Sequence, residues 1–159
     1  MRGTFRGNVM TTMLSTKKFD EEKDDIKIIC GNDWHLIPNS QYEAQCIGFF
    51  QKPFFNQLKL YLRFKITSDG AHINKELIKS YRLPKNKKMA RSSNYFHDWV
   101  LVNGRKLPSR NALMSPKIFK NKRILISTRT VTCDFNGDEL PEHLHYSVVN
   151  KIIEVLVNG

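Results

Sequence analysis

The nine residues 58–66, LKLYLRFKI, constrain the fold more than any other segment of this sequence. Their apolar members are Leu58, Leu60, Leu62, Phe64 and Ile66, and they alternate with Lys59, Tyr61, Arg63 and Lys65. A strict period of two predicts a β-strand with one buried face and one solvated face. The solvated face then presents three cations around one aromatic ring, and this combination needs an explanation.

The segment before this strand predicts a hairpin partner. Residues 42–50, YEAQCIGFF, are a strand candidate, and the following Pro53 is expected to break the strand because proline cannot donate to a sheet ladder. Phe54 and Phe55 then lie at the tip of a loop between two strands. Rings at a hairpin tip are candidate ligand contacts, although burial under a neighbouring loop is an equal alternative.

The middle of the chain predicts a third strand and a short helix. Residues 73–83 favour a strand because of their neighbours, although KELIK taken alone is typical of a helix. Ser92 and Ser93 are candidate N-caps for a helix over residues 94–103, whose apolar side chains, Trp99 among them, recur at helical spacing and are expected in the core.

The last third of the chain predicts a long strand and then a C-terminal helix. Residues 123–135 are rich in β-branched side chains, and Asn136-Gly137 is expected to end that strand. After Pro141, the apolar residues Leu144, Val148, Ile152 and Val155 recur at helical spacing, although their β-branching leaves a strand open. We therefore expect an α+β, mostly β fold: an OB-fold-like Greek-key barrel with a short helix and a C-terminal helix.

Length and composition indicate one domain. Residues 26–159 are expected to form it, and residues 1–25 a flexible N-terminal tail, because their mixed charges show no apolar periodicity. No run of about eighteen apolar residues occurs, so we expect neither a membrane-spanning helix nor a membrane partner. Cys30, Cys46 and Cys133 are too widely spaced for zinc or a disulfide framework, which favours the cytoplasm and no cofactor.

The positive charge is concentrated in the middle of the chain. The net charge is +11, and residues 75–132 alone hold fifteen basic residues against two carboxylates, a net of +13. Residues 133–159 hold one lysine against five acidic residues. A solvated basic surface is the plain alternative, but such clustering favours a polyanionic partner, and nucleic acid is the commonest one.

These observations define a candidate nucleic-acid interface. The strand with the alternating pattern contributes Tyr61 for stacking on bases, and its cations for the phosphate backbone. The hairpin tip adds Phe54 and Phe55. The full set of candidate binding residues is Phe54, Phe55, Lys59, Tyr61, Arg63, Lys65, Lys85, Lys87, Lys88, Arg91, Arg105, Lys106, Arg110, Lys120, Lys122 and Arg123.

Three segments also resemble a known family. WHLIPNSQYEAQCIGFF, LKLYLRFKI and TRTVTCDFNGDELPEHLHYSVV are similar to small single-stranded-DNA-binding proteins encoded by phages, plasmids and integrative elements. The resemblance covers residues 34–156, and Asn39-Ser40 departs from the glycine turn usual before Tyr42. It implies an OB-fold and non-catalytic binding of single-stranded DNA during replication, recombination or transfer of a mobile element. RNA, a second copy of the chain and replication or recombination proteins are further candidate partners.

Two other functions use different residues. His143 and His145 flank one apolar residue, as metal ligands do in nucleases and replication initiators that nick single strands, with Tyr95 or Tyr146 as the nucleophile. Two surface histidines without a metal are the plain alternative, and no third ligand is evident. A duplex binder could use the helix over residues 94–103, but that helix is too apolar for a recognition helix. Motifs of phosphate-binding loops and serine hydrolases do not occur.

Overall fold

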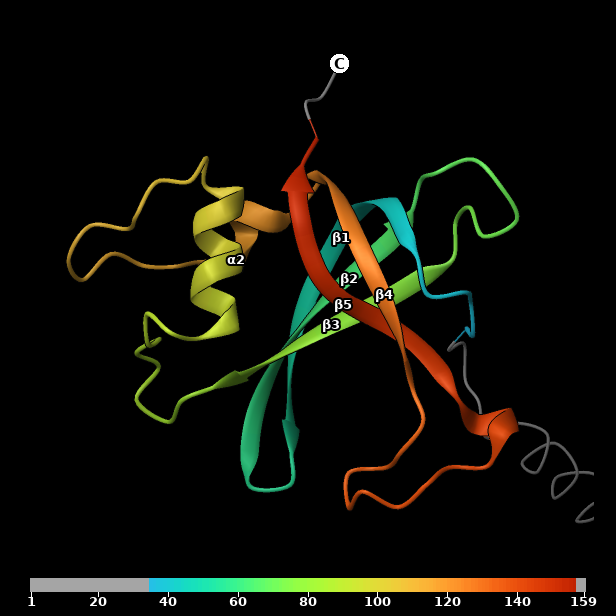
Figure 1. The fold of residues 1–159 in the computed structure, drawn as a ribbon. Coiled ribbons are helices and arrows are strands. Elements are labelled where there is room, and N and C mark those ends of the chain that lie inside the picture. The colour runs from blue at the N-terminus through green and yellow to red at the C-terminus, as the bar shows by residue number, and fades with distance from the viewer. Residues whose placement is uncertain (1–34, 157–159) are drawn as a thin grey trace, which may run out of the picture. The chain divides into compact units, whose positions relative to one another are not determined.

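The computed structural model describes residues 35–156 (Figure 1). Five antiparallel strands form one sheet in the order β3-β2-β1-β4-β5. The strands are β1 (Gln41–Phe54), β2 (Gln57–Ile66), β3 (Glu76–Leu83), β4 (Arg123–Val131) and β5 (Tyr146–Val155). One short α-helix, α2 (Asn94–Val102), lies between β3 and β4. The predicted tail, the domain boundary at residue 26 and Cys30 lie outside the described residues.

The alternating strand is confirmed. In β2, Leu60, Leu62, Phe64 and Ile66 are buried, each 2% exposed or less. Tyr61 is half-buried and Arg63 is exposed on the opposite face. β2 pairs with β1 on one side and with β3 on the other, so it is central in this part of the sheet.

The break predicted at Pro53 is wrong. β1 continues through Pro53, which pairs with Leu58, and the chain reverses only at Phe55 and Asn56. β4 pairs with β1 only from Gln41 to Gln45, so the far half of β1 is a sheet edge. Proline is tolerated there because no neighbouring strand requires its missing N–H.

A bulge in β1 changes which side chains face outward. The register with β2 shifts between Cys46 and Gly48, which leaves one extra residue in β1. Cys46 is buried before the bulge, whereas after it Phe49 packs against the core and Phe50 is 40% exposed. The bulge therefore turns an aromatic side chain outward.

The predicted C-terminal helix is wrong. Residues 146–155 form strand β5, and only Glu142–Leu144 form a single 3₁₀ turn, η2. Two shifts in the β4–β5 register interrupt the alternation, so Val149 and Ile152 are both buried three residues apart. Bulges thus gave a β-branched strand the spacing of a helix.

The predicted strand over residues 123–135 ends earlier than expected. β4 stops at Val131, and a connection that includes an isolated bridge between Cys133 and Glu139 follows. The Asp134 carboxylate accepts backbone N–H bonds from Asn136 and Asp138, which favours a turn over a strand. Cys133, which lies within the strand predicted over residues 123–135, is consequently exposed and outside β4.

The helix over residues 94–103 is confirmed as a core element. The Ser93 hydroxyl accepts from the Phe96 N–H, and the helix ends at Asn103 before Gly104, which has a φ of +71°. Tyr95, Phe96, Trp99 and Val102 are buried, so α2 does not present a recognition surface. No helix among the described residues is long and apolar enough to cross a membrane.

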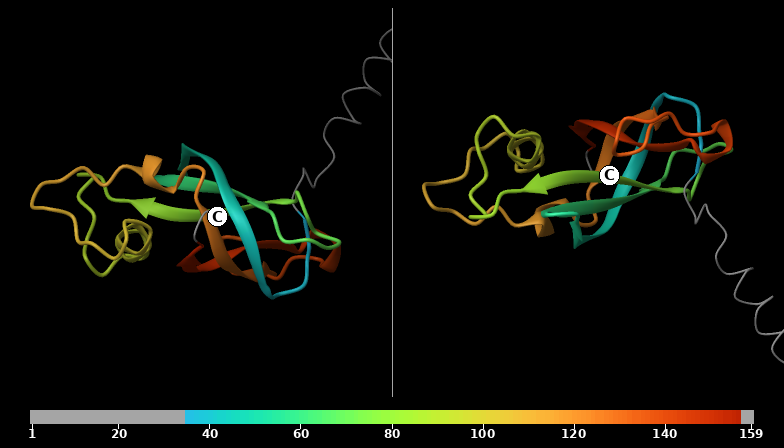
Figure 2. Two further views of the ribbon diagram at one scale, coloured as in Figure 1. Left: turned by 90° about the horizontal axis from the view of Figure 1, so that it is seen from above. Right: turned by 90° about the horizontal axis from the view of Figure 1, so that it is seen from below.

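The two edge strands of the sheet approach each other. The Lys79 ammonium on β3 donates to the Asn150 carbonyl on β5 at 2.9 Å. Among the described residues no β3–β5 ladder closes the sheet, so the architecture is a strongly curved, five-stranded sheet with one helix. Figure 2 shows α2 and its flanking connections on one side of the strands, with the β2–β3 and β4–β5 connections opposite.

Candidate nucleic-acid interface

The outer face of β1, β2 and β3 gathers aromatic and basic side chains in adjacent rows. One row consists of Phe50, Tyr61 and Ser80, which are opposite one another in register. The next row toward the hairpin tip consists of Lys52, Lys59 and Arg82. Cross-strand neighbours on one face lie about 4.5–5.5 Å apart at their Cβ atoms, so three cations stand beside one aromatic pair.

The aromatic pair is a parallel stack. The rings of Phe50 and Tyr61 have centroids 4.9 Å apart and an interplanar angle of 14°. Partial burial raises the pKa of the Tyr61 hydroxyl, so this side chain stays neutral at physiological pH. Tyr61 lies on the outer face as predicted, but Phe50 covers one face of its ring, so the two rings act as one platform.

A second aromatic group joins two loops at the hairpin end of this face. Phe55 packs on Phe135 with centroids 4.4 Å apart and on Phe54 at 4.7 Å. Figure 1 shows the β1–β2 turn and the β4–β5 connection side by side at this end. Phe55 and Phe135 are 67% and 64% exposed. The Lys59 ammonium lies 4.5 Å from the Phe54 ring centroid, which links this cluster to the basic row.

Phe55 adopts an unusual backbone conformation at the turn. Its φ of +56° lies in the left-handed region, which a bulky side chain rarely adopts. This conformation costs on the order of 1 kcal/mol per residue. The tight turn requires this conformation. As a result, a large and mostly exposed ring stands at the end of the outer face.

The other end of the same face is less positive than predicted. The Arg63 guanidinium forms a 2.7 Å ion pair with the Glu76 carboxylate across the strands. Lys65 is directly opposite Glu76 in the β2–β3 register. The uncompensated charge of β2 therefore lies toward Lys59 and the hairpin tip.

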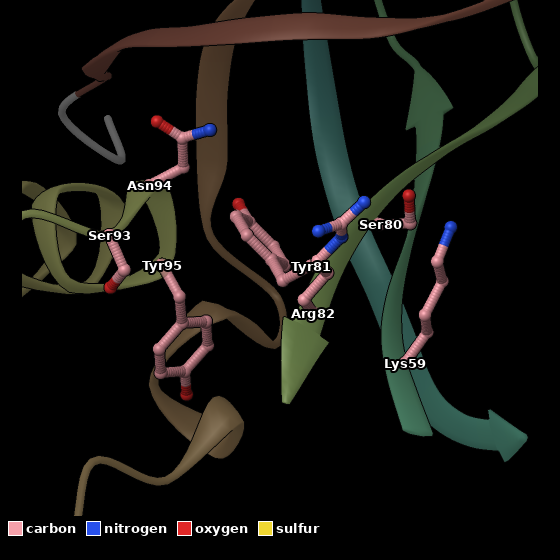
Figure 3. A pocket seen from close by; sticks show the side chains of 7 residues that line it. All are labelled: Lys59, Ser80, Tyr81, Arg82, Ser93, Asn94 and Tyr95. Carbon is pink, nitrogen blue, oxygen red and sulfur yellow. The ribbon is translucent and has the colours of Figure 1, made fainter. Parts of the chain in front are cut away.

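A small pocket lies where this face meets the start of α2. It has a volume of about 360 Å³, and its lining residues are Lys59, Ser80, Tyr81, Arg82, Ser93, Asn94 and Tyr95. Figure 3 shows Lys59, Ser80 and Arg82 on neighbouring strands, with Ser93 and Asn94 opposite them on the helix side. Two cations and small polar groups without a carboxylate are a suitable environment for a phosphate.

The other predicted basic residues are not brought to this face. Lys85, Lys87, Lys88 and Arg91 are exposed on the connection between β3 and α2. Arg105, Lys106 and Arg110 lie on the connection after α2, and Lys120 and Lys122 precede β4. Arg123 pairs with Gln45 in the β1–β4 register, far along β1 from Lys52, and contacts the Glu43 carboxylate at 3.4 Å.

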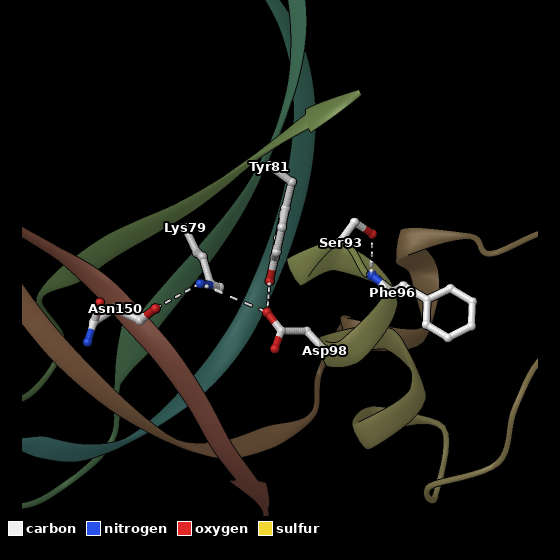
Figure 4. A network of polar contacts seen from close by, with 6 residues as sticks. All are labelled: Lys79, Tyr81, Ser93, Phe96, Asp98 and Asn150. Carbon is white, nitrogen blue, oxygen red and sulfur yellow. Dashed lines mark hydrogen bonds and ion pairs between the residues drawn. The ribbon is translucent and has the colours of Figure 1, made fainter. Parts of the chain in front are cut away.

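A polar network stands inside the fold near the small pocket (Figure 4). The Asp98 carboxylate of α2 accepts from the Tyr81 hydroxyl at 2.7 Å and lies 3.9 Å from the Lys79 ammonium. Burial raises the pKa of Asp98 and lowers the pKa of Lys79, and these two charges offset each other only in part. The network ties β3 to α2 and β5, and we assign it a structural role.

Within the described part of the chain, the histidine pair forms no metal cluster with other side chains. His145 Nε2 lies 3.0 Å from the Leu140 carbonyl oxygen, and His143 is exposed on η2. Within residues 35–156, no group of three His, Cys, Asp or Glu side chains could hold a metal ion. Tyr95, one of the nominated nucleophiles, is buried and donates its hydroxyl to the Met114 carbonyl, and burial raises its pKa.

Sequence reasoning missed four residues of the outer face and its loops. Phe50, Lys52 and Arg82 were not assigned to the interface, and Phe135 was expected inside a strand. Gly48 was the available signal, because a glycine within a strand often marks a bulge that changes which face the next side chains occupy. Phe135 follows Asp134, whose turn-forming side chain was a signal that the strand ends before it.

Comparison with known proteins identifies no relative of this chain. A scan against protein-family models and a search of curated proteins found no match to this chain. The resemblance to single-stranded-DNA-binding proteins of mobile elements therefore stays a prediction.

Proposed function

We propose that this protein binds single-stranded nucleic acid, DNA in the first instance, through the outer face of β1, β2 and β3, without catalysis. The observation that carries the proposal is the stack of Phe50 and Tyr61 beside a row of three cations: Lys52, Lys59 and Arg82. Aromatic rings bind the flat faces of bases, and cations bind the phosphates between them. Neither contact reads base edges, so sequence preference is weak.

The arrangement favours single strands over duplexes. Bases within a duplex are stacked on one another and offer only their edges, whereas unpaired bases can stack on the platform of Phe50 and Tyr61 or on the exposed rings of Phe55 and Phe135. We propose the 360 Å³ pocket beside Lys59 and Arg82 as the binding site of a backbone phosphate.

We further propose that the sheet is a partly open barrel of the OB type. Its strand order, the helix between β3 and β4, and the Lys79–Asn150 hydrogen bond between the edge strands support this. OB-folds bind oligonucleotides on the face of strands 2 and 3, between the β1–β2 and β4–β5 loops. In this chain the same two loops carry the contact between Phe55 and Phe135.

The wider role rests on the resemblance alone. It supports a cytoplasmic protein that protects or presents single strands during replication, recombination or transfer of a mobile element. Replication or recombination proteins, and a second copy of the chain, are its proposed partners.

The proposal is tested by fluorescence anisotropy with labelled strands of about 20 nucleotides, longer than the 4–16 nucleotides that one OB-fold covers. Single-stranded DNA, RNA of the same sequence and the duplex are titrated with the full chain. We expect the single strands to bind more tightly than the duplex and to remain intact with magnesium or manganese. Equal affinity for the duplex, or metal-dependent cleavage lost in His143→Ala, would overturn the proposal.

A further inference from the structure

A second concave surface includes Gln51 and Leu60, which lie on the other face of the β1–β2 hairpin from Phe50 and Tyr61. A groove of about 900 Å³ opens between the connection before α2 and the connection after it. Leu83, Met89, Phe96 and Met114 contribute apolar surface to it, and Leu113, 90% exposed, stands at its lip. Leu113 thus extends the apolar surface of the groove into solvent, and contiguous exposed apolar surface rimmed by polar residues marks interaction sites.

The charge around this groove has a single sign. Lys87, Lys88, Arg91 and Arg110 line it, and none of the described residues that line it is an aspartate or a glutamate. The two connections thus bring together cations that are distant in the sequence. An occupant with acidic groups at its edges and apolar groups at its centre complements this surface.

The groove is held in shape by the helix beneath it. The Tyr95 hydroxyl donates to the Met114 carbonyl at 2.6 Å, and the Trp99 indole N–H donates to the Ser115 carbonyl at 3.1 Å. Both bonds anchor the connection after α2 to buried residues of the helix. A preformed groove binds with a smaller loss of conformational entropy than a loop that must be ordered first.

The chemistry of the groove favours a peptide over a nucleic acid. Its aromatic members, Tyr95 and Phe96, are 4% and 9% exposed, so they offer no open ring face on which a base could stack. Methionine and leucine side chains instead suit the apolar side chains of an amphipathic helix, because they adapt to irregular shapes.

We propose that this groove is a docking site for an acidic, amphipathic peptide segment of a partner protein. The apolar residues of the segment fill the groove over Met89 and Met114, and its carboxylates pair with the lysines and arginines of the rim. The groove does not include Phe50 or Tyr61, and it shares only Tyr95 with the small pocket, so we expect the protein to hold a single strand and a partner at once. The docking proposal does not depend on the proposed function.

The test titrates the full chain with a labelled synthetic peptide of about 18 residues, five helical turns, which carries leucines on one helical face and glutamates on the other. A peptide of the same composition with the apolar face scrambled is the control probe. We expect the amphipathic peptide to bind at least about ten-fold more tightly than the scrambled one, because pure charge attraction does not distinguish them.

Two variants locate the binding. Leu113→Asp is expected to weaken the peptide roughly ten-fold, the loss of one anchor residue. Leu107→Asp is the matched control, since Leu107 is 61% exposed and does not line the groove, and it should bind like wild type. Circular dichroism checks that both variants stay folded.

Four results would overturn the proposal. Equal binding of the scrambled peptide would show that the groove attracts acidic peptides by charge alone. If Leu113→Asp binds the peptide with wild-type affinity, the peptide binds at a site other than this groove. Loss of single-strand binding in Leu113→Asp, or loss of a self-associated form, assigns the groove to nucleic acid or to a second copy of the chain instead. Retained peptide binding in Tyr61→Ala, with single-strand binding lost, separates this site from the proposed function.

Discussion

Removing the Tyr61 ring should weaken single-strand binding and leave the protein folded. The ring stands on the outer face of β2, where it stacks on Phe50 with the ring centroids 4.9 Å apart. Loss of an aromatic pair costs about 0.5–1.5 kcal/mol of folding stability beyond the loss of the area that the ring buries. Loss of base stacking costs about 1–3 kcal/mol of binding free energy, or roughly five- to 150-fold in affinity. Thermal melts and fluorescence titrations of Tyr61→Ala measure the two effects separately.

Two further variants make this prediction sharp. Tyr61→Phe keeps the ring and should retain most of the affinity. Leu62→Ala acts from the opposite face, where the side chain is 0% exposed, and should cost about 2–5 kcal/mol of stability while the folded fraction binds normally. Wild-type affinity in a folded Tyr61→Ala would show that the outer face is only solvated surface. Unfolding of Tyr61→Ala with no effect of Leu62→Ala would refute the assignment of the two sheet faces.

Three other regions give predictions of their own. Burial raises the pKa of the Asp98 carboxyl, so the folded state holds the carboxyl proton more tightly than the unfolded state does. The contribution of Asp98 to stability therefore falls as pH rises from about 4 through the raised pKa. In urea melts, Asp98→Asn should therefore gain stability relative to wild type as pH rises, and the opposite trend would mean that pairing with Lys79 outweighs burial. Phe55→Gly relieves a positive φ and should stay within about 1 kcal/mol of wild-type stability while single-strand affinity falls; a larger loss of stability would make this ring structural. An alkylating reagent should modify exposed Cys133 in the folded protein and Cys46, which is buried with its pKa raised to about 11, only after unfolding; equal rates in peptide mapping would contradict the fold.

The sequence predicted the centre of the sheet because one simple pattern governs it. The alternation from Leu58 to Ile66 identified β2, its buried face and the outward position of Tyr61. The helix after Ser93 was equally readable, since a capping serine and a terminal Asn-Gly pair mark both of its ends. Local signals of this kind depend only on neighbours in the chain.

Bulges account for most of what the sequence did not predict. The shift at Gly48 turned Phe50 outward beside Tyr61, and a fixed period of two cannot anticipate such a shift. Two shifts in the pairing of β5 buried Val149 and Ile152 three residues apart, which imitates a helix. Whether a bulge forms depends on the neighbouring strand, so the pattern of one strand alone is insufficient.

The basic residues show a different limit. Composition predicted a single positive surface, but long-range folding divides its members. Lys59 and Arg82 meet on the outer sheet face, whereas Lys88 and Arg110 meet at the separate groove. Arg63 is compensated by an ion pair with a residue thirteen positions away in sequence. Charge counts along a chain do not contain this information.

The most direct test of the central claim is the salt dependence of single-strand binding in two charge-matched variants. Lys59→Ala with Arg82→Ala removes two cations from the outer face, and Lys117→Ala with Lys151→Ala removes two from elsewhere. Each phosphate contact contributes about −0.7 to the slope of log affinity against log salt, so the first variant should lose about 1.4 units of slope, measured between roughly 50 and 200 mM salt. The account predicts a wild-type slope for the second variant. Equal slopes in both variants would contradict the placement of the strand on β1, β2 and β3.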